Sequence, residues 1–175
     1  QVGNPEALAV DAQNRLYIAD TGNHRVLVYN SVTATGQQPD FVFGSQGTST
    51  KLENKFQFTR GLAVDSQNHL FVTDEFNNRI LAYNLPITAN NPTPFAQFTG
   101  LNGPRAVAVD SDDNVYIADS QNAQVKIFTQ PVTANNYTTP SRTIGQQHAS
   151  DCSSTANQTS ATYLSCPIDL VLDKA

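Results

Sequence analysis

The stretch LAVDSQNHLFVTDEFNNRILAY at residues 62–83 decides the fold, because it occurs three times with small changes. Residues 8–29 read LAVDAQNRLYIADTGNHRVLVY, and residues 107–128 read VAVDSDDNVYIADSQNAQVKIF. The three copies align without gaps, and each has two aspartates nine positions apart, as at Asp11 and Asp20. Apolar and aromatic segments bounded by polar turns are typical of short β-strands joined by hairpins.

Each copy predicts three strands, and a fourth strand follows after a looser loop. The expected strands are residues 8–10, 15–19, 26–29 and 41–43, then 62–64, 70–73, 80–83 and 95–98, then 106–109, 115–118, 125–128 and 142–144. In the turn after the second strand, Gly22 and Asn23 are expected to supply the positive φ angles of a tight hairpin. No segment sustains the 3.6-residue apolar period of a helix, so none is predicted.

A fourth unit begins at PIDLVLD, residues 167–173, which matches PRAVAVD at residues 104–110. Four strands in about 40–50 residues is the period of a propeller blade. The sequence therefore predicts an all-β propeller segment of four-stranded antiparallel blades: three blades plus the first strand of a fourth. We expect one partial propeller domain over residues 1–175, with blade repeats at about 5–44, 59–100, 104–145 and a start of the next blade at 167–175.

The shared pattern P-x-x-(L/V)-A-V-D, followed by (L/V)-(Y/F)-(I/V)-(A/T)-D-x-x-N-x-R-(V/I), resembles the NHL repeat. ADTGNHRV at residues 19–26 is especially similar. This resemblance implies an NHL-type β-propeller. It leaves the function open, because such propellers serve as scaffolds, sensors, RNA-binding proteins and lyases.

The second aspartate of each unit precedes the tight turn, with an asparagine three residues later. We expect its carboxylate to accept turn N–H groups and, in two units, to pair with an arginine five residues later. A ring of metal-binding carboxylates is the alternative. The predicted turn network comprises Asp20, Asn23, Arg25, Asp74, Asn77, Arg79, Asp119 and Asn122.

The third unit departs from this pattern, because Ala123 and Gln124 stand where the first unit has His24 and Arg25. We therefore expect a weaker hairpin in the third blade.

The NHL resemblance also raises a histidine metal site of the kind found in amidating lyases. However, His24 lies in a turn between second and third strands, and His69 lies in a turn between first and second strands. These turns belong to opposite faces of a propeller, so the two side chains cannot converge on one ion. His148 lies in a long loop. We predict no catalytic residues, no cofactor and no metal ligands in this segment.

Cys152 and Cys166 flank a polar segment and predict a local disulfide, with two free thiols as the alternative. Asn136 and Asn157 begin the glycosylation sequons Asn-Tyr-Thr and Asn-Gln-Thr. Together these features favour a secreted or cell-surface glycoprotein. The long loops 45–60 and 146–166 are expected on the face of the second-to-third strand turns, either as binding loops or as tolerated insertions.

The net charge of −5 and the pI of about 4.9 argue against nucleic acid as a partner. No apolar run reaches the ~20 residues that a membrane helix needs. We expect a binding or assembly scaffold that is not an enzyme in this segment, with a protein, a glycan or copies of itself as partner. Because propellers close with about 4–8 blades, the remaining blades are expected from the same or another chain. The alternative is a fragment of an NHL-type metal-dependent lyase or lactonase with its ligands elsewhere.

Overall fold

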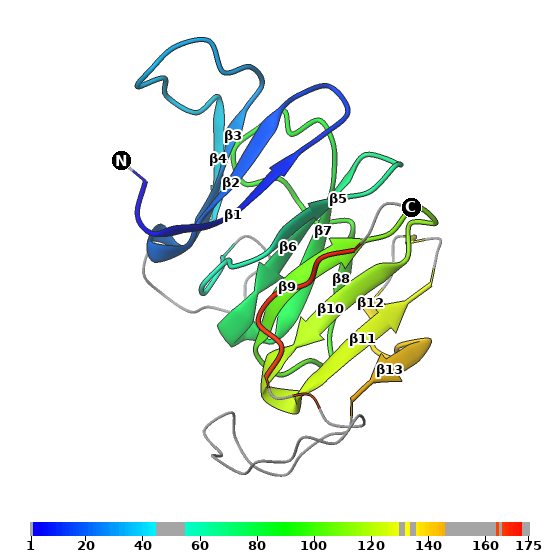
Figure 1. Cartoon of the computed structure of the whole chain (residues 1–175). Helices are drawn as coiled ribbons and strands as arrows, with labels where there is room; N and C mark the ends of the chain where they lie inside the picture. Colours follow the sequence, from blue (N-terminus) through cyan, green and yellow to red (C-terminus); the bar gives the residue numbers. More distant parts are fainter. Residues whose placement is uncertain are drawn as a thin grey trace.

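The computed structural model describes residues 2–44, 55–129, 132–133, 136–145, 164 and 166–172. Their strands form three sheets that stand side by side in chain order (Figure 1). The first sheet contains β1 (Pro5–Val10), β2 (Leu16–Asp20), β3 (Arg25–Tyr29) and β4 (Phe41–Gly44). The second contains β5 (Leu62–Val64), β6 (His69–Asp74), β7 (Arg79–Asn84), β8 (Ala96–Phe98) and β12 (Asn136–Tyr137). The third contains β9 (Pro104–Val109), β10 (Val115–Asp119), β11 (Gln124–Phe128) and β13 (Arg142–Ile144).

Each sheet is built around an antiparallel four-stranded meander, as the sequence predicts, and we call the three meanders blades 1, 2 and 3. The strands of one blade follow each other in chain order from the first strand to the fourth. β1 begins three residues before the expected start, because Pro5 pairs with Asp20 after a register shift near Ala7.

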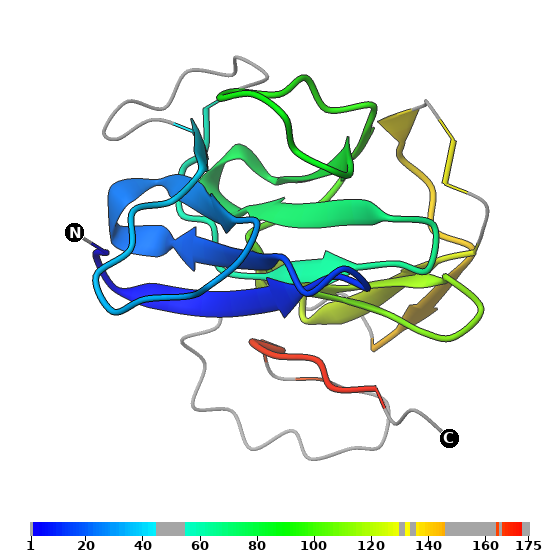
Figure 2. The same cartoon turned by 90° about the horizontal axis from the view of Figure 1, so that it is seen from above.

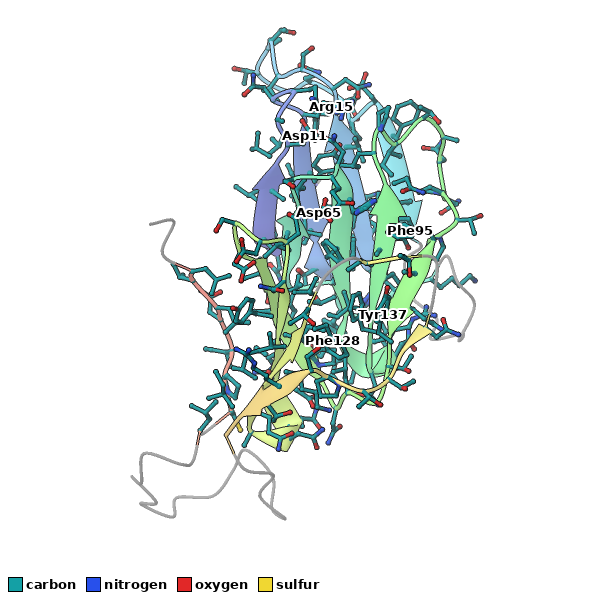
Figure 3. The ribbon with its side chains drawn as sticks, turned by 90° about the vertical axis from the view of Figure 1, so that its right-hand side faces the viewer. Asp11, Arg15, Asp65, Phe95, Phe128 and Tyr137 are labelled. Atoms are coloured by element: carbon teal, nitrogen blue, oxygen red, sulfur yellow. The ribbon has the colours of Figure 1, made fainter. Side chains whose placement is uncertain are left out.

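Two hydrophobic cores lie between the blades. Leu70, Leu81 and Tyr83 of blade 2 face blade 1, whereas Phe71 and Ile80 face blade 3. Both faces of blade 2 are therefore buried, which explains its consecutive apolar residues. In the second core, Figure 3 shows Phe128 close to Tyr137, whose ring stacks on Phe98 at a centroid distance of 4.8 Å.

The turn between the second and third strands is a single turn of 3-10 helix in every blade, which the sequence analysis did not predict. The three turns are η1 (Thr21–Asn23), η2 (Glu75–Asn77) and η3 (Ser120–Asn122). The left-handed residue follows the helical turn and is His24, Asn78 or Ala123, with φ of 56°, 55° and 53°. The prediction of positive φ at Gly22 and Asn23 was therefore wrong.

Gly22 has a different role, since a Cβ there would lie 2.7 Å from the carbonyl oxygen of Gly3. The same carbonyl accepts a hydrogen bond from the Gly22 N–H at 2.8 Å. A side chain at this position would push the incoming segment away from the turn.

The outer edges of blades 1 and 2 are covered by the following blade. Asn90 and Asn91, from the loop of blade 2, accept hydrogen bonds from the N–H groups of Val42 and Gly44 in β4. In blade 3 the corresponding loop forms β12, an unexpected strand that pairs in parallel with β8. These contacts occupy N–H groups that an edge strand would otherwise expose to another chain.

The segment 166–172 lies beside the first strands of the blades, where the first strand of the next blade is predicted (Figure 2). It is extended, but it forms no strand ladder with the residues that the structure describes. A hydrogen bond of 2.5 Å from Ser120 Oγ to the Pro167 carbonyl ties it to blade 3.

Within the described ranges, no helix has the length and apolar character needed to cross a bilayer.

Candidate functional site

The first strands of the three blades and the segment 166–172 surround a common space, which we call the axial channel. Its upper part, at the end of the 3-10 turns, is a cavity of about 520 Å³. Its lower part, at the end of the first-to-second strand turns, is a cavity of about 580 Å³, and Leu170 lines both parts. Volumes of about 300–1,000 Å³ are typical of small-molecule sites.

A chain of ion pairs crosses the upper mouth and joins all three blades. Glu6 of β1 accepts two hydrogen bonds from one terminal nitrogen of Arg60, at 2.7 and 2.5 Å. The Nε of Arg60 donates to one oxygen of Glu75, and the Nε of Arg105 in β9 donates to the other at 2.8 Å. Glu75 is 1% exposed, so this carboxylate is held by two guanidinium groups from neighbouring blades.

Blade 2 differs from the other blades at this point. The residues equivalent to Glu75 are Thr21 and Ser120, whose hydroxyl groups donate to the carbonyls of Thr59 and Pro167 in the next repeat at 2.5 Å. These are direct contacts between adjacent blades. In blade 2 the equivalent residue, Glu75, instead forms an ion pair with Arg105 of blade 3, and Arg105 lines the channel.

The hairpins of the blades share one geometry, because the second aspartate of each unit makes equivalent contacts. Asp20 accepts hydrogen bonds from Asn23 Nδ2, from Arg25 Nε at 2.6 Å and from the Gly3 N–H at 2.6 Å. In blade 2, Asp74 does the same with Asn77, Arg79 and the Gln57 N–H.

We expected each carboxylate to accept hydrogen bonds from the backbone N–H groups of its own turn, and this prediction was wrong, because neither carboxylate does. The backbone donor comes from the segment that enters the blade. Each aspartate therefore connects the segment that leads into the first strand with the turn between the second and third strands.

The two carboxylates differ in their electrostatics. Burial raises the pKa of Asp20, but hydrogen bonds from Asn23, Gly3 and Arg25 outweigh it, so the pKa lies below the usual value. Burial raises the pKa of Asp74 above its usual value, despite hydrogen bonds from Gln57, Arg79 and Asn77. A fully enclosed ion pair loses more hydration than a partly open one.

Blade 3 keeps the same network with a different cation, so the reason for expecting a weaker hairpin there was wrong. Asp119 accepts from the Asn102 N–H and from Asn122, as its equivalents do. Lys126 supplies the positive charge, with its Nζ 2.7 Å from Asp119 Oδ2. Lys126 lies two residues beyond Gln124, and side chains two apart point to the same face of a strand.

The first aspartate of each unit closes the lower turn. Asp11 accepts from the N–H groups of Gln13 and Arg15 and from the Tyr17 hydroxyl at 2.8 Å, and Figure 3 shows it beside Arg15. Asp110 makes equivalent contacts with the N–H groups of Asp112 and Asn114. These acceptors are occupied within their own turns, which indicates a structural role.

Solved structures with related architecture show the fold. The periplasmic gluconolactonase PpgL of Pseudomonas aeruginosa matches with a TM-score of 0.63 and 12% identity, covering 81% of this chain and 40% of that one. A streptogramin B lyase matches at 0.51 and 11% identity, covering 73% and 38%. The RRP9 WD40 repeats match at 0.51 and 13%, covering 71% and 33%. The chain thus spans 33–40% of the length of these structures.

A family model settles the type of repeat, because the NHL repeat model matches residues 3–29 and 101–128. The chain contains NHL repeats. A comparison with curated proteins gives no significant match. The structural neighbours include enzymes and a WD40 repeat protein, so the NHL propeller fold does not itself assign a function.

His24 and His69 of this NHL propeller lie apart. His24 ends the upper turn of blade 1, and its Nδ1 accepts the Phe58 N–H at 3.0 Å. His69 begins β6 at the lower end, where its Nδ1 lies 2.7 Å from Asp65 Oδ2. His148 lies outside the described residues. In the part of the chain that the structure describes, no group of three or more acidic, histidine or cysteine side chains could hold a metal ion.

Several predicted features fall partly outside the described residues. Cys152 and Asn157 are among them, so the disulfide to Cys166 and the second sequon stay predictions. Asn136 is exposed on β12. Residues 55–60 of the first long loop contact the upper turn of blade 2, since the Glu75 N–H donates to the Phe58 carbonyl.

The charged residues of the upper mouth were not predicted from the sequence. Arg60 and Arg105 occupy the same position of the repeat, one residue after the Pro or Thr that opens it, and Glu6 is their equivalent in blade 1. A usable signal was present, because Glu75 replaces a hydroxyl residue in the one blade that has an arginine at this position both at its own start and at the start of the next blade.

Proposed function

We propose that this NHL propeller is a non-catalytic binding and assembly scaffold that works outside the cell, and that its axial channel contacts the partner. One observation carries the proposal: four charged groups at the channel mouth are linked by ion pairs across the blades, namely Glu6, Arg60, Glu75 and Arg105. A carboxylate that acts as general acid or base must be within reach of the substrate. Both oxygens of Glu75 are held by arginines, which suits a rigid binding surface.

The extracellular location is supported by the cysteine pair and by the accessible sequon. Asn136 and Thr138 are both exposed, so the sequon at the edge of blade 2 is open to modification. A protein, a glycan or copies of the chain remain the proposed partners, with further blades supplied by the same or another chain.

The competing proposal is a metal-dependent lyase or lactonase whose ligands lie elsewhere in the protein. This alternative is supported by the similar fold of a gluconolactonase and a streptogramin B lyase.

Metal analysis of the full-length natural protein separates the two proposals. We expect no stoichiometric calcium or zinc after dialysis, and no hydrolysis of gluconolactone above the background rate. A stoichiometric metal together with hydrolysis that EDTA abolishes would overturn the scaffold proposal.

A further inference from the structure

Arg105 has donors that its protein neighbours do not use. Its Nε is bound to Glu75, whereas no other described residue reaches its two terminal nitrogens. Its side chain is 38% exposed and lines the upper cavity. A guanidinium group with two free terminal nitrogens presents the parallel donors that bind a carboxylate through both oxygens.

The local charge balance favours Arg105 over Arg60 as the anchor. Arg60 contacts both Glu6 and Glu75, so two carboxylates neutralise it. Among the described carboxylates, Arg105 pairs with Glu75 alone, and Glu75 also pairs with Arg60. Asp169 also lines the cavity and carries a negative charge, and its Oδ1 accepts a hydrogen bond from the Leu170 N–H.

Aliphatic side chains line part of this cavity, beside its polar groups. Leu8 and Ile168 line the same cavity and are 65% and 64% exposed. Leu62 and Val107 line it from the other blades. Large aliphatic side chains exposed inside a concave surface are typical of a binding site, because a ligand removes them from water.

We propose that the upper cavity binds an aliphatic carboxylate, with the carboxylate on the terminal nitrogens of Arg105 and the hydrocarbon part against Leu8 and Ile168. This inference rests on the proposed function and names the ligand chemistry of the same channel. Two sources present this chemistry: a small aliphatic acid, and the C-terminal residue of a peptide such as leucine.

Calorimetric titration of the full chain with four probes tests the proposal. The probes are hexanoate, hexanamide, the tripeptide acetyl-Gly-Gly-Leu with a free carboxylate, and the same tripeptide as its C-terminal amide. We expect each acid to bind at least about tenfold more tightly than its amide, the size of one charge-assisted contact. Tighter binding of hexanoate would point to a small acid, and tighter binding of the tripeptide acid would point to a chain end.

Variants locate the contact. Arg105→Gln should weaken binding of the acids by about tenfold or more and leave the amides unchanged. Arg105→Lys keeps the charge next to Glu75 and should weaken acid binding less, which guards against a folding defect. Asp169→Asn should tighten acid binding by about two- to fivefold, since a like charge is removed. Arg142→Gln, on the exposed outer strand β13, is the matched control and should change nothing.

Equal affinity for acids and amides would overturn the carboxylate inference while leaving the channel a binding site. Unchanged acid binding in a folded Arg105→Gln variant would also overturn it, as would no binding of any probe. The scaffold proposal fails by a separate result, namely stoichiometric metal with hydrolysis of gluconolactone.

Discussion

Lys126 lies with its Nζ 2.7 Å from Asp119 Oδ2 and takes the place that Arg25 and Arg79 hold in the other blades. The blade network therefore tolerates a change in the position of its cation, provided that the charge reaches the buried carboxylate. Asp119 is completely buried, so its charge depends on these partners.

Replacing Lys126 by methionine should destabilise the protein by about 3 kcal/mol, because it leaves a buried carboxylate without its cation. The free energy of unfolding in urea measures the effect. Adding Gln124→Arg to this variant should restore part of the loss, since it recreates the arrangement of blades 1 and 2. Equal stability of wild type and Lys126→Met would show that the ion pair is dispensable.

The hydroxyl contacts between blades give a second prediction. Thr21→Val keeps the shape of the side chain but removes the donor to the Thr59 carbonyl, which should cost about 1 kcal/mol. Thr35→Val, at an exposed loop position, is the matched control. If both variants unfold at the same urea concentration as wild type, the contact does not stabilise the junction.

Acid should weaken the network at Asp20. The pKa of this carboxyl is lowered in the folded state, so its contribution is complete above its unfolded pKa of about 4 and is lost as the pH falls further. Asp20→Asn should therefore be less stable at neutral pH and show a shallower loss of stability as the pH falls below about 4. Asp112→Asn removes an exposed negative charge in the lower turn of blade 3 and controls for net charge. An unchanged slope in Asp20→Asn would contradict the assignment.

The extracellular proposal predicts two covalent features in protein from its native source. Peptide mapping under non-reducing conditions should join peptides that contain Cys152 and Cys166, and a glycosidase should change the mass of the peptide that contains Asn136. Alkylation of both cysteines in native protein, together with an unmodified Asn136, would remove the support for secretion.

Local patterns were sufficient to predict the blades, because alternating and consecutive apolar residues such as Leu70 and Phe71 mark strands that are buried on both faces. Contacts between blades were beyond such patterns. Arg60 and Arg105 meet at Glu75, although they lie 15 and 30 residues from it in sequence. The substitute role of Lys126 was readable from the strand period, since it shares a face with Gln124. The parallel strand β12 depends on contact with β8 of another blade, which no local signal reports.

Methyl NMR of the full chain during titration with hexanoate tests most directly whether the axial channel is the binding site. We predict that the methyl resonances of Leu8 and Ile168 shift progressively and saturate, while those of the core residues Val28 and Leu81 stay in place. Shifts confined to residues outside the channel, or no shifts at all, would contradict the account.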